Sequence, residues 1–121
     1  MTPEALKKRT KQFGLRVIRL VENLPNTKAA SMIAGQLLRC GTSVGANYRA
    51  ACRGRSKAEF IAKLGIVEEE AEESAYWIEM LVEAEIVKIS QVRQLHTEAD
   101  ELTSIMVKSR QTARRSKNRQ S

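Results

Sequence analysis

The sequence is poor in the residues that break helices or build β-sheets. Its 121 residues include only two prolines and six glycines, and aromatic side chains make up 4%. A β-sandwich needs many turns and a core rich in β-branched and aromatic residues, so this composition argues against one. No run of about 18 apolar residues occurs, so we expect no membrane span. The N-terminus is basic but lacks the apolar stretch of a signal peptide, which favours a cytoplasmic protein.

Residues that carry catalytic or metal chemistry are also scarce. His96 is the only histidine and Cys40 and Cys52 are the only cysteines, too few for a zinc site or a paired nucleophile and base. The two cysteines fall on one predicted helix, roughly 18 Å apart at 1.5 Å per residue. A disulfide needs Cα atoms within about 7 Å, so we expect buried, reduced thiols.

Two local patterns invite a chemical reading that their details do not support. The segment from Gly41 to Gly45 is not a P-loop, because it lacks the lysine and the glycine spacing of that motif. Glu69 and Glu73 share a helix face within the acidic run 68–73, but the Glu-x-x-His motif of di-iron bundles is missing. A solvated or interface-facing acidic strip is the simpler interpretation. The sequence therefore predicts no catalytic residue, no metal and no cofactor, and a protein that is not an enzyme.

Four segments show the three- and four-residue apolar spacing of helices. The first runs from Pro3 to the Leu24-Pro25 pair, and the third covers about 57–85. The first helix is predicted to start at Thr2, because Pro3 suits the first helical position. The other starts are predicted at residues whose side chains cap free N–H groups: Asn26 or Thr27, Ser56 as part of a capping box with Glu59, and Ser90.

The second segment contains glycines in its middle, which makes it ambiguous. Each glycine costs about 1 kcal/mol relative to alanine in a helix, so a break between Gly41 and Gly45 is the alternative. The apolar phase continues from Ile33 to Ala51 without a slip, which favours one helix. The small residues would then allow another helix to approach closely.

Short connections between long helices make neighbours antiparallel. We therefore predict an all-α fold, an antiparallel up-down-up-down four-helix bundle formed by residues 1–108. Residues 109–121 are basic and almost without apolar side chains, and we expect them to fray into a tail.

Charge is segregated along the chain. Residues 1–55 contain eleven Lys and Arg against two Glu, residues 56–101 contain four against twelve acidic residues, and residues 102–121 contain six and no acid. Two basic helices and a basic tail suit a phosphate backbone, although any single arginine could be an ordinary solvated charge. The predicted nucleic-acid contacts are the arginines of these segments: Arg9, Arg16, Arg19, Arg39, Arg49, Arg53, Arg110, Arg114 and Arg115. Aromatic residues fall among apolar positions, so we expect phosphate contacts, with RNA or DNA, and not base readout.

Residues 36–51 (QLLRCGTSVGANYRAA) closely resemble the signature of the bacterial four-helix-bundle family encoded in 23S rRNA intervening sequences. The likeness continues in residues 60–67 (FIAKLGIV), in Glu70-Ala71 with Glu73, and in residues 76–79 (YWIE). It covers about residues 13–85. The chain departs from the family at Ala50, where an acid is usual, and at Glu69, where a lysine is frequent.

The resemblance implies a bundle that assembles into a ring, generally a pentamer, and a second segment that is one helix. The related accessory variability determinants of diversity-generating retroelements form similar basic pentamers that bind nucleic acid and a reverse transcriptase. A reverse transcriptase-like protein is accordingly an expected partner. The expected oligomer interface contains small, amide and acidic residues: Gly41, Ser43, Gly45, Asn47, Glu70 and Glu73. Asn47 could bond across helices or only locally. The alternative function is a protein-protein assembly adaptor, whose charged faces serve oligomerisation or a protein partner.

Overall fold

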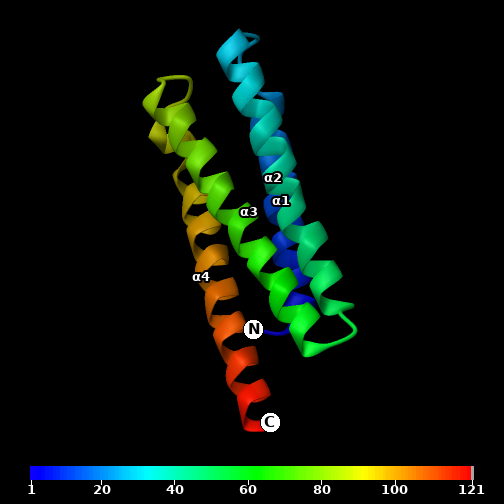
Figure 1. Cartoon of the computed structure of the whole chain (residues 1–121). Helices are drawn as coiled ribbons and strands as arrows, with labels where there is room; N and C mark the ends of the chain where they lie inside the picture. The colour runs from blue at the N-terminus through cyan, green and yellow to red at the C-terminus, as the bar shows by residue number, and fades with distance from the viewer. Residues whose placement is uncertain (121) are drawn as a thin grey trace.

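In the computed structural model, four antiparallel helices form the fold of the described residues (Figure 1). The structure describes the backbone of residues 1–120 and the side chains of residues 1–116. The helices are α1 (Pro3–Glu22), α2 (Lys28–Cys52), α3 (Lys57–Glu83) and α4 (Ile89–Gln120). The predicted all-α up-down-up-down bundle is therefore confirmed. Within residues 1–120, none of the helices is long and apolar enough to cross a membrane.

The helices begin where local capping chemistry predicts. Thr2, Thr27 and Ser56 have extended backbones, and the side chain of each accepts a hydrogen bond from the N–H three residues later. The Glu59 carboxylate accepts from the N–H of Arg55, at 3.4 Å, one residue before the position that a capping box predicts. Helix α4 begins at Ile89, so the predicted cap at Ser90 lies inside the helix.

Helix α2 is continuous through its glycines, which confirms the preferred interpretation of that segment. A Cβ added at Gly41 would lie 2.8 Å from Val17 Cγ2, and one at Gly45 would lie 3.2 Å from the carbonyl oxygen of Thr10. Both glycines therefore allow α1 to pack closely against α2. The helical cost of glycine is offset because a larger residue would separate the two helices.

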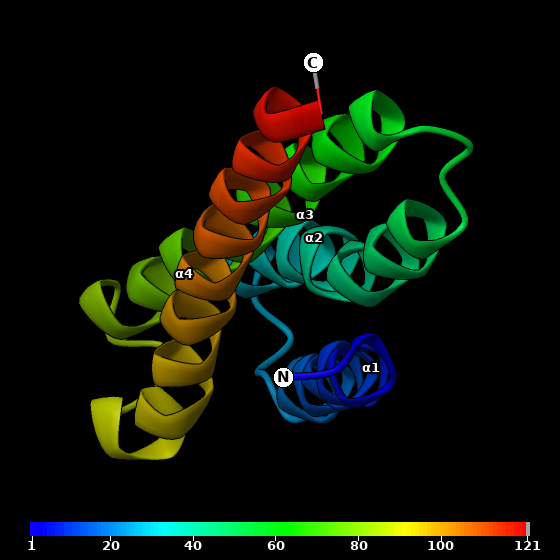
Figure 2. The same cartoon turned by 90° about the horizontal axis from the view of Figure 1, so that it is seen from below.

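The core is aliphatic and runs the length of the bundle. It extends from Leu6 and Leu64 at one end to Ile33, Leu81 and Val92 at the other. Helices that follow each other in sequence pack against each other, and of the pairs in contact, α1 and α4 make the smallest contact (Figure 2). Two buried hydroxyls are satisfied within their own helices, since each donates to the carbonyl four residues earlier: Thr10 and Ser74.

Helix α4 continues to Gln120, beyond the point near Ser109 where the sequence led us to expect a frayed tail. The described part of this extension is attached to α3. Arg110 Nη2 lies 2.6 Å from Glu68 Oε1, and Lys57 Nζ donates a hydrogen bond to Ser116 Oγ. These side-chain contacts, which the low hydrophobicity of the segment does not reveal, hold the described part of the extension against α3. The last predicted tail residue, Ser121, lies outside the described residues.

Candidate nucleic-acid interface

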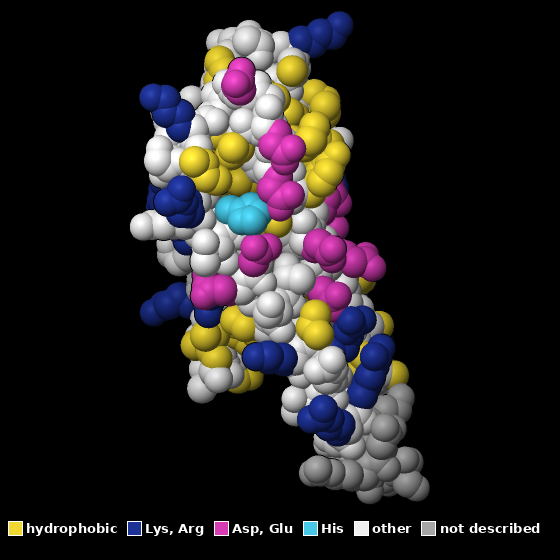
Figure 3. Space-filling model, turned by 90° about the vertical axis from the view of Figure 1, so that its left-hand side faces the viewer, with side chains coloured by type: hydrophobic (Ala, Val, Ile, Leu, Met, Phe, Trp, Pro, Cys, Tyr) yellow, Lys and Arg dark blue, Asp and Glu magenta, His cyan; other side chains and the backbone are white. Residues whose placement is uncertain are grey.

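The antiparallel arrangement converts charge segregation along the chain into segregation along the bundle axis. The start of α1, the end of α2, the start of α3 and the last described turns of α4 meet at one end, which we call the basic end (residues 1–13, 45–68 and 105–116). It contains thirteen Lys and Arg against three Glu. The remaining described half, residues 14–44 and 69–104, contains six against eleven acidic residues. On the face drawn in Figure 3, acidic side chains lie above, below and to the right of His96. Lys and Arg lie together near the lower end, from which α4 projects, and singly along the left edge and at the top.

Some of the cations at the basic end are already paired. Arg9 donates from Nε and Nη2 to the two carboxylate oxygens of Glu98, both at 2.7 Å, and its Nη2 lies 3.5 Å from Glu101. The bidentate bond to Glu98 raises the pKa of Arg9. Arg110 is paired with Glu68, and Lys7 lies 3.2 Å from Glu4.

Arg39 is engaged in the opposite half of the molecule. Its guanidinium joins α2 to α3 by contacting Glu70, at 3.2 Å, and Glu73, at 2.5 Å. The hydrogen bond with Glu73 raises the pKa of Arg39, and Glu73 also accepts a bond from Trp77 Nε1 at 3.1 Å. Arg9, Arg39 and Arg110, three of the predicted phosphate contacts, are therefore already neutralised by carboxylates of the same chain.

The other predicted arginines divide between the two ends. Arg16 and Arg19 lie in the acidic half, where they line a groove of about 380 Å³ against Gln91 and Gln94 of α4. The basic end keeps cations for which the described residues provide no ion pair. They include four predicted arginines, together with five residues that the sequence analysis missed: Arg49, Arg53, Arg114, Arg115, Lys8, Lys11, Arg55, Lys63 and Lys108. The missed residues could have been found from the predicted topology, because in an up-down bundle the start of each helix lies beside the end of the helix before it.

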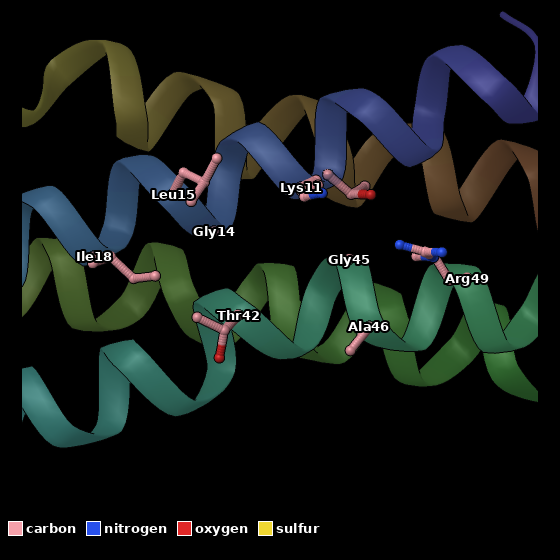
Figure 4. A pocket seen from close by; sticks show the side chains of 9 residues that line it. Lys11, Gly14, Leu15, Ile18, Thr42, Gly45, Ala46 and Arg49 are labelled. Atoms are coloured by element: carbon pink, nitrogen blue, oxygen red, sulfur yellow. The ribbon is translucent and has the colours of Figure 1, made fainter.

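A groove between α1 and α2 lies next to this cluster (Figure 4). Its volume is about 260 Å³, and its lining comes from both helices: Thr10, Lys11, Gly14, Leu15, Ile18, Thr42, Gly45, Ala46 and Arg49. Gly14 and Gly45 belong to its floor, where the backbones of α1 and α2 approach each other closely. Lys11 and Arg49 are exposed at its edge, and no acidic residue is among the lining.

The predicted oligomer interface is divided by the fold. Gly41 and Gly45 are buried under α1, and the space that they leave is used within the chain. Their contact with a second copy stays a prediction. Ser43 and Asn47 are half-buried on the outer side of α2, and Asn47 Nδ2 donates to the carbonyl of Ser43 at 2.9 Å. This is the local alternative for Asn47. Glu70 and Glu73, also half-buried, are the partners of Arg39 on α3.

An exposed apolar surface on α3 was not identified from the sequence. Ile66 and Tyr76 are 38% and 51% exposed, and both lie on the outer side of this helix. The Tyr76 ring packs edge-on against Trp77, with ring centroids 5.0 Å apart. Trp77 is held in turn by its bond to Glu73, so the aromatic pair is fixed in orientation.

The remaining reactive groups are separated from one another. His96 Nε2 lies 2.7 Å from Glu79 Oε2, and its Nδ1 lies 3.6 Å from Asp100. Across the described residues, no three His, Cys, Asp or Glu side chains are grouped so that they could hold a metal ion. Cys40 and Cys52 are free thiols, and burial raises the pKa of Cys40.

Comparison with known proteins gives a consistent result. The sequence model of the family described as "23S rRNA-intervening sequence protein" matches residues 5–108. A crystal structure from Bacteroides thetaiotaomicron, titled as a protein with unknown function from the S23 ribosomal protein family, is 32% identical, with a TM-score of 0.85 over 92% of this chain and 99% of the other. No curated protein matches. The family match and the bundle geometry lead to the same conclusion: the chain belongs to the 23S rRNA-intervening sequence protein family.

Proposed function

We propose that this protein is a non-enzymatic, oligomeric scaffold that binds RNA or DNA through phosphate contacts at the basic end. The observation that carries the proposal is the excess of Lys and Arg at one end of the bundle. Thirteen of them lie there with three Glu of the same segments and with Glu98 and Glu101, which reach Arg9 from the adjoining part of α4. An imbalance of this size repels cations and attracts a polyanion. Binding then releases condensed counterions, which supplies most of the affinity for a nucleic-acid backbone.

The chemistry of the basic end favours phosphate over base recognition. Its unpaired cations are Arg and Lys side chains of all four helices and of the α2–α3 connection, so they present separate positive charges over a broad surface. The most exposed aromatic residue, Tyr76, lies in the acidic half and not among the unpaired cations. Contacts of this kind position a nucleic acid without reading its sequence.

Fluorescence anisotropy with a labelled structured RNA and a DNA duplex of matched length tests the proposal. With about five phosphates neutralised, log Kd should change with log salt with a slope of about 4.5. Binding that survives near-physiological salt with such a slope supports a phosphate-binding surface. Absence of binding at low salt would contradict it.

Self-association is the second part of the proposal, and the apolar surface of α3 supports it. Ile66 and Tyr76 offer exposed hydrophobic area beside the Arg39 ion pairs, which a second copy would cover. The number five rests on the family resemblance. In sedimentation velocity, Tyr76→Glu should dissociate the oligomer, whereas Glu85→Ala, a change at an exposed residue after α3, should not.

The adaptor function stays the competing proposal. It is favoured if the oligomer dissociates in high salt while the protein shows no affinity for either nucleic acid. A reverse transcriptase-like partner, which the resemblance to retroelement accessory proteins suggests, would be tested by co-purification with such an enzyme.

A further inference from the structure

The groove between α1 and α2 has two chemically different ends. In Figure 4 the Arg49 guanidinium lies in the gap between the helices near Lys11, whereas Leu15 and Ile18 lie further along α1. The hydroxyls of Thr10 and Thr42 donate to the carbonyls of Leu6 and Leu38, so neither needs a ligand. The Thr42 hydroxyl points away from the groove. One end is therefore cationic and the rest is apolar.

We propose that this groove holds one unpaired nucleotide of a bound strand, with its phosphate between Lys11 and Arg49 and its base against Leu15 and Ile18. The inference rests on the proposed function and specifies its substrate class as single-stranded nucleic acid. An anion with a flat apolar body matches both ends of the groove in charge and polarity. The volume of about 260 Å³ is slightly below the range of about 300–1,000 Å³ for drug-sized ligands, which suits a single base.

This geometry discriminates between single and double strands. In a duplex the bases are stacked and paired, so only phosphates could reach Lys11 and Arg49 and the apolar part would stay empty. An unpaired base can turn out of the stack and pack against the apolar wall of the groove, as bases do on apolar and aromatic surfaces of single-strand binding proteins. Because the side-chain hydroxyls in the lining are already bonded within α1 and α2, we expect little preference among the four bases.

The test compares an unstructured RNA strand with a hairpin duplex of the same number of phosphates, by anisotropy at one salt concentration. The full chain should bind the single strand about tenfold more tightly, since each base placed on an apolar surface contributes on the order of one such factor. Thr42→Leu with Ala46→Leu would fill the groove while leaving both cations in place. Ala29→Leu with Ser31→Leu is the matched control, because these residues are also exposed on α2 but lie far from the groove.

The filled variant should lose the preference for single strands and bind the duplex as before, and the control should keep the preference. If the wild-type protein binds both probes equally, or the filled variant keeps the preference, the inference is wrong while the proposed phosphate binding stands. If neither probe binds at low salt, the proposed function fails, and the inference with it.

Discussion

The two halves of the bundle have similar aliphatic cores but surfaces of opposite charge. Leu6, Ala51 and Leu64 pack at the basic end much as Ile33, Leu81 and Val92 pack in the acidic half, all at most 6% exposed. Outside this core, Lys and Arg outnumber acids thirteen to three in one half, whereas acids outnumber them eleven to six in the other. Stability therefore depends on the aliphatic core, which the halves share, and the proposed binding depends on the surface charge, which distinguishes them. The two properties should respond to different substitutions.

Charge reversal at the basic end should have the largest effect. Arg49→Glu, Arg53→Glu and Arg115→Glu together should weaken RNA binding on the order of a hundredfold, because they remove three phosphate contacts and add three repulsions. The charge-matched control, Arg19→Glu, Lys28→Glu and Arg93→Glu, alters exposed residues of the other half and should change affinity by about threefold at most. Equal losses in anisotropy would show that net charge, and not its location, governs binding.

Substitution of two glycines of α2 should change the stability of the protein without changing its RNA affinity. Gly41→Ala places a methyl 2.8 Å from the buried Val17, so it should destabilise the bundle by about 1–3 kcal/mol. Gly35→Ala meets no atom within 4 Å and should stabilise it by about 0.5–1 kcal/mol through helix propensity. Urea denaturation measures both, and the RNA affinity of the folded protein should stay unchanged. A stabilising Gly41→Ala would contradict the close α1–α2 contact.

Releasing a paired arginine should strengthen binding at the expense of stability. Glu98→Gln removes the charge that holds Arg9, so the free energy of unfolding should fall by about 1 kcal/mol. The RNA affinity should rise about threefold, because Arg9 becomes available for a phosphate. Glu79→Gln removes the same charge next to His96, away from the basic end, and serves as the control. If both variants bind alike, Arg9 does not reach the nucleic acid.

Alkaline pH should produce the smallest effect. Burial raises the pKa of Cys40, and burial with the nearby Cys52 raises that of Tyr48. Because the folded state keeps these protons longer than the unfolded chain, their contribution to stability is complete below the ordinary pKa values and declines as pH rises through them. Urea midpoints should decrease above about pH 9, and Cys40→Ala should remove part of the slope. A midpoint that stays constant would contradict the burial of both groups.

Local features of the sequence predicted much of the fold. The helix start at Thr2, the cap at Ser56, the choice of Asn26 or Thr27 as a cap, the continuity of α2 and the antiparallel order follow from side chains within a few residues of each other. The candidate site, in contrast, depends on contacts between residues that are far apart in the sequence. The Arg9–Glu98 pair joins residues 89 positions apart, and the attachment of Arg110 to Glu68 depends on how α4 is rotated against α3. Neither the rotation nor the axial alignment of helices is encoded in a local pattern, so free and paired arginines could not be distinguished in advance.

Lysine footprinting tests the central claim most directly. Limited acetylation of the full chain, with and without a structured RNA, compares exposed lysines of the two halves in one sample. The basic end contributes Lys8, Lys11 and Lys108, and the acidic half contributes Lys28 and Lys88. We predict that RNA protects the first group and leaves the second as reactive as in the free protein. Equal protection of both groups, or protection of Lys28 and Lys88 alone, would contradict binding at the basic end.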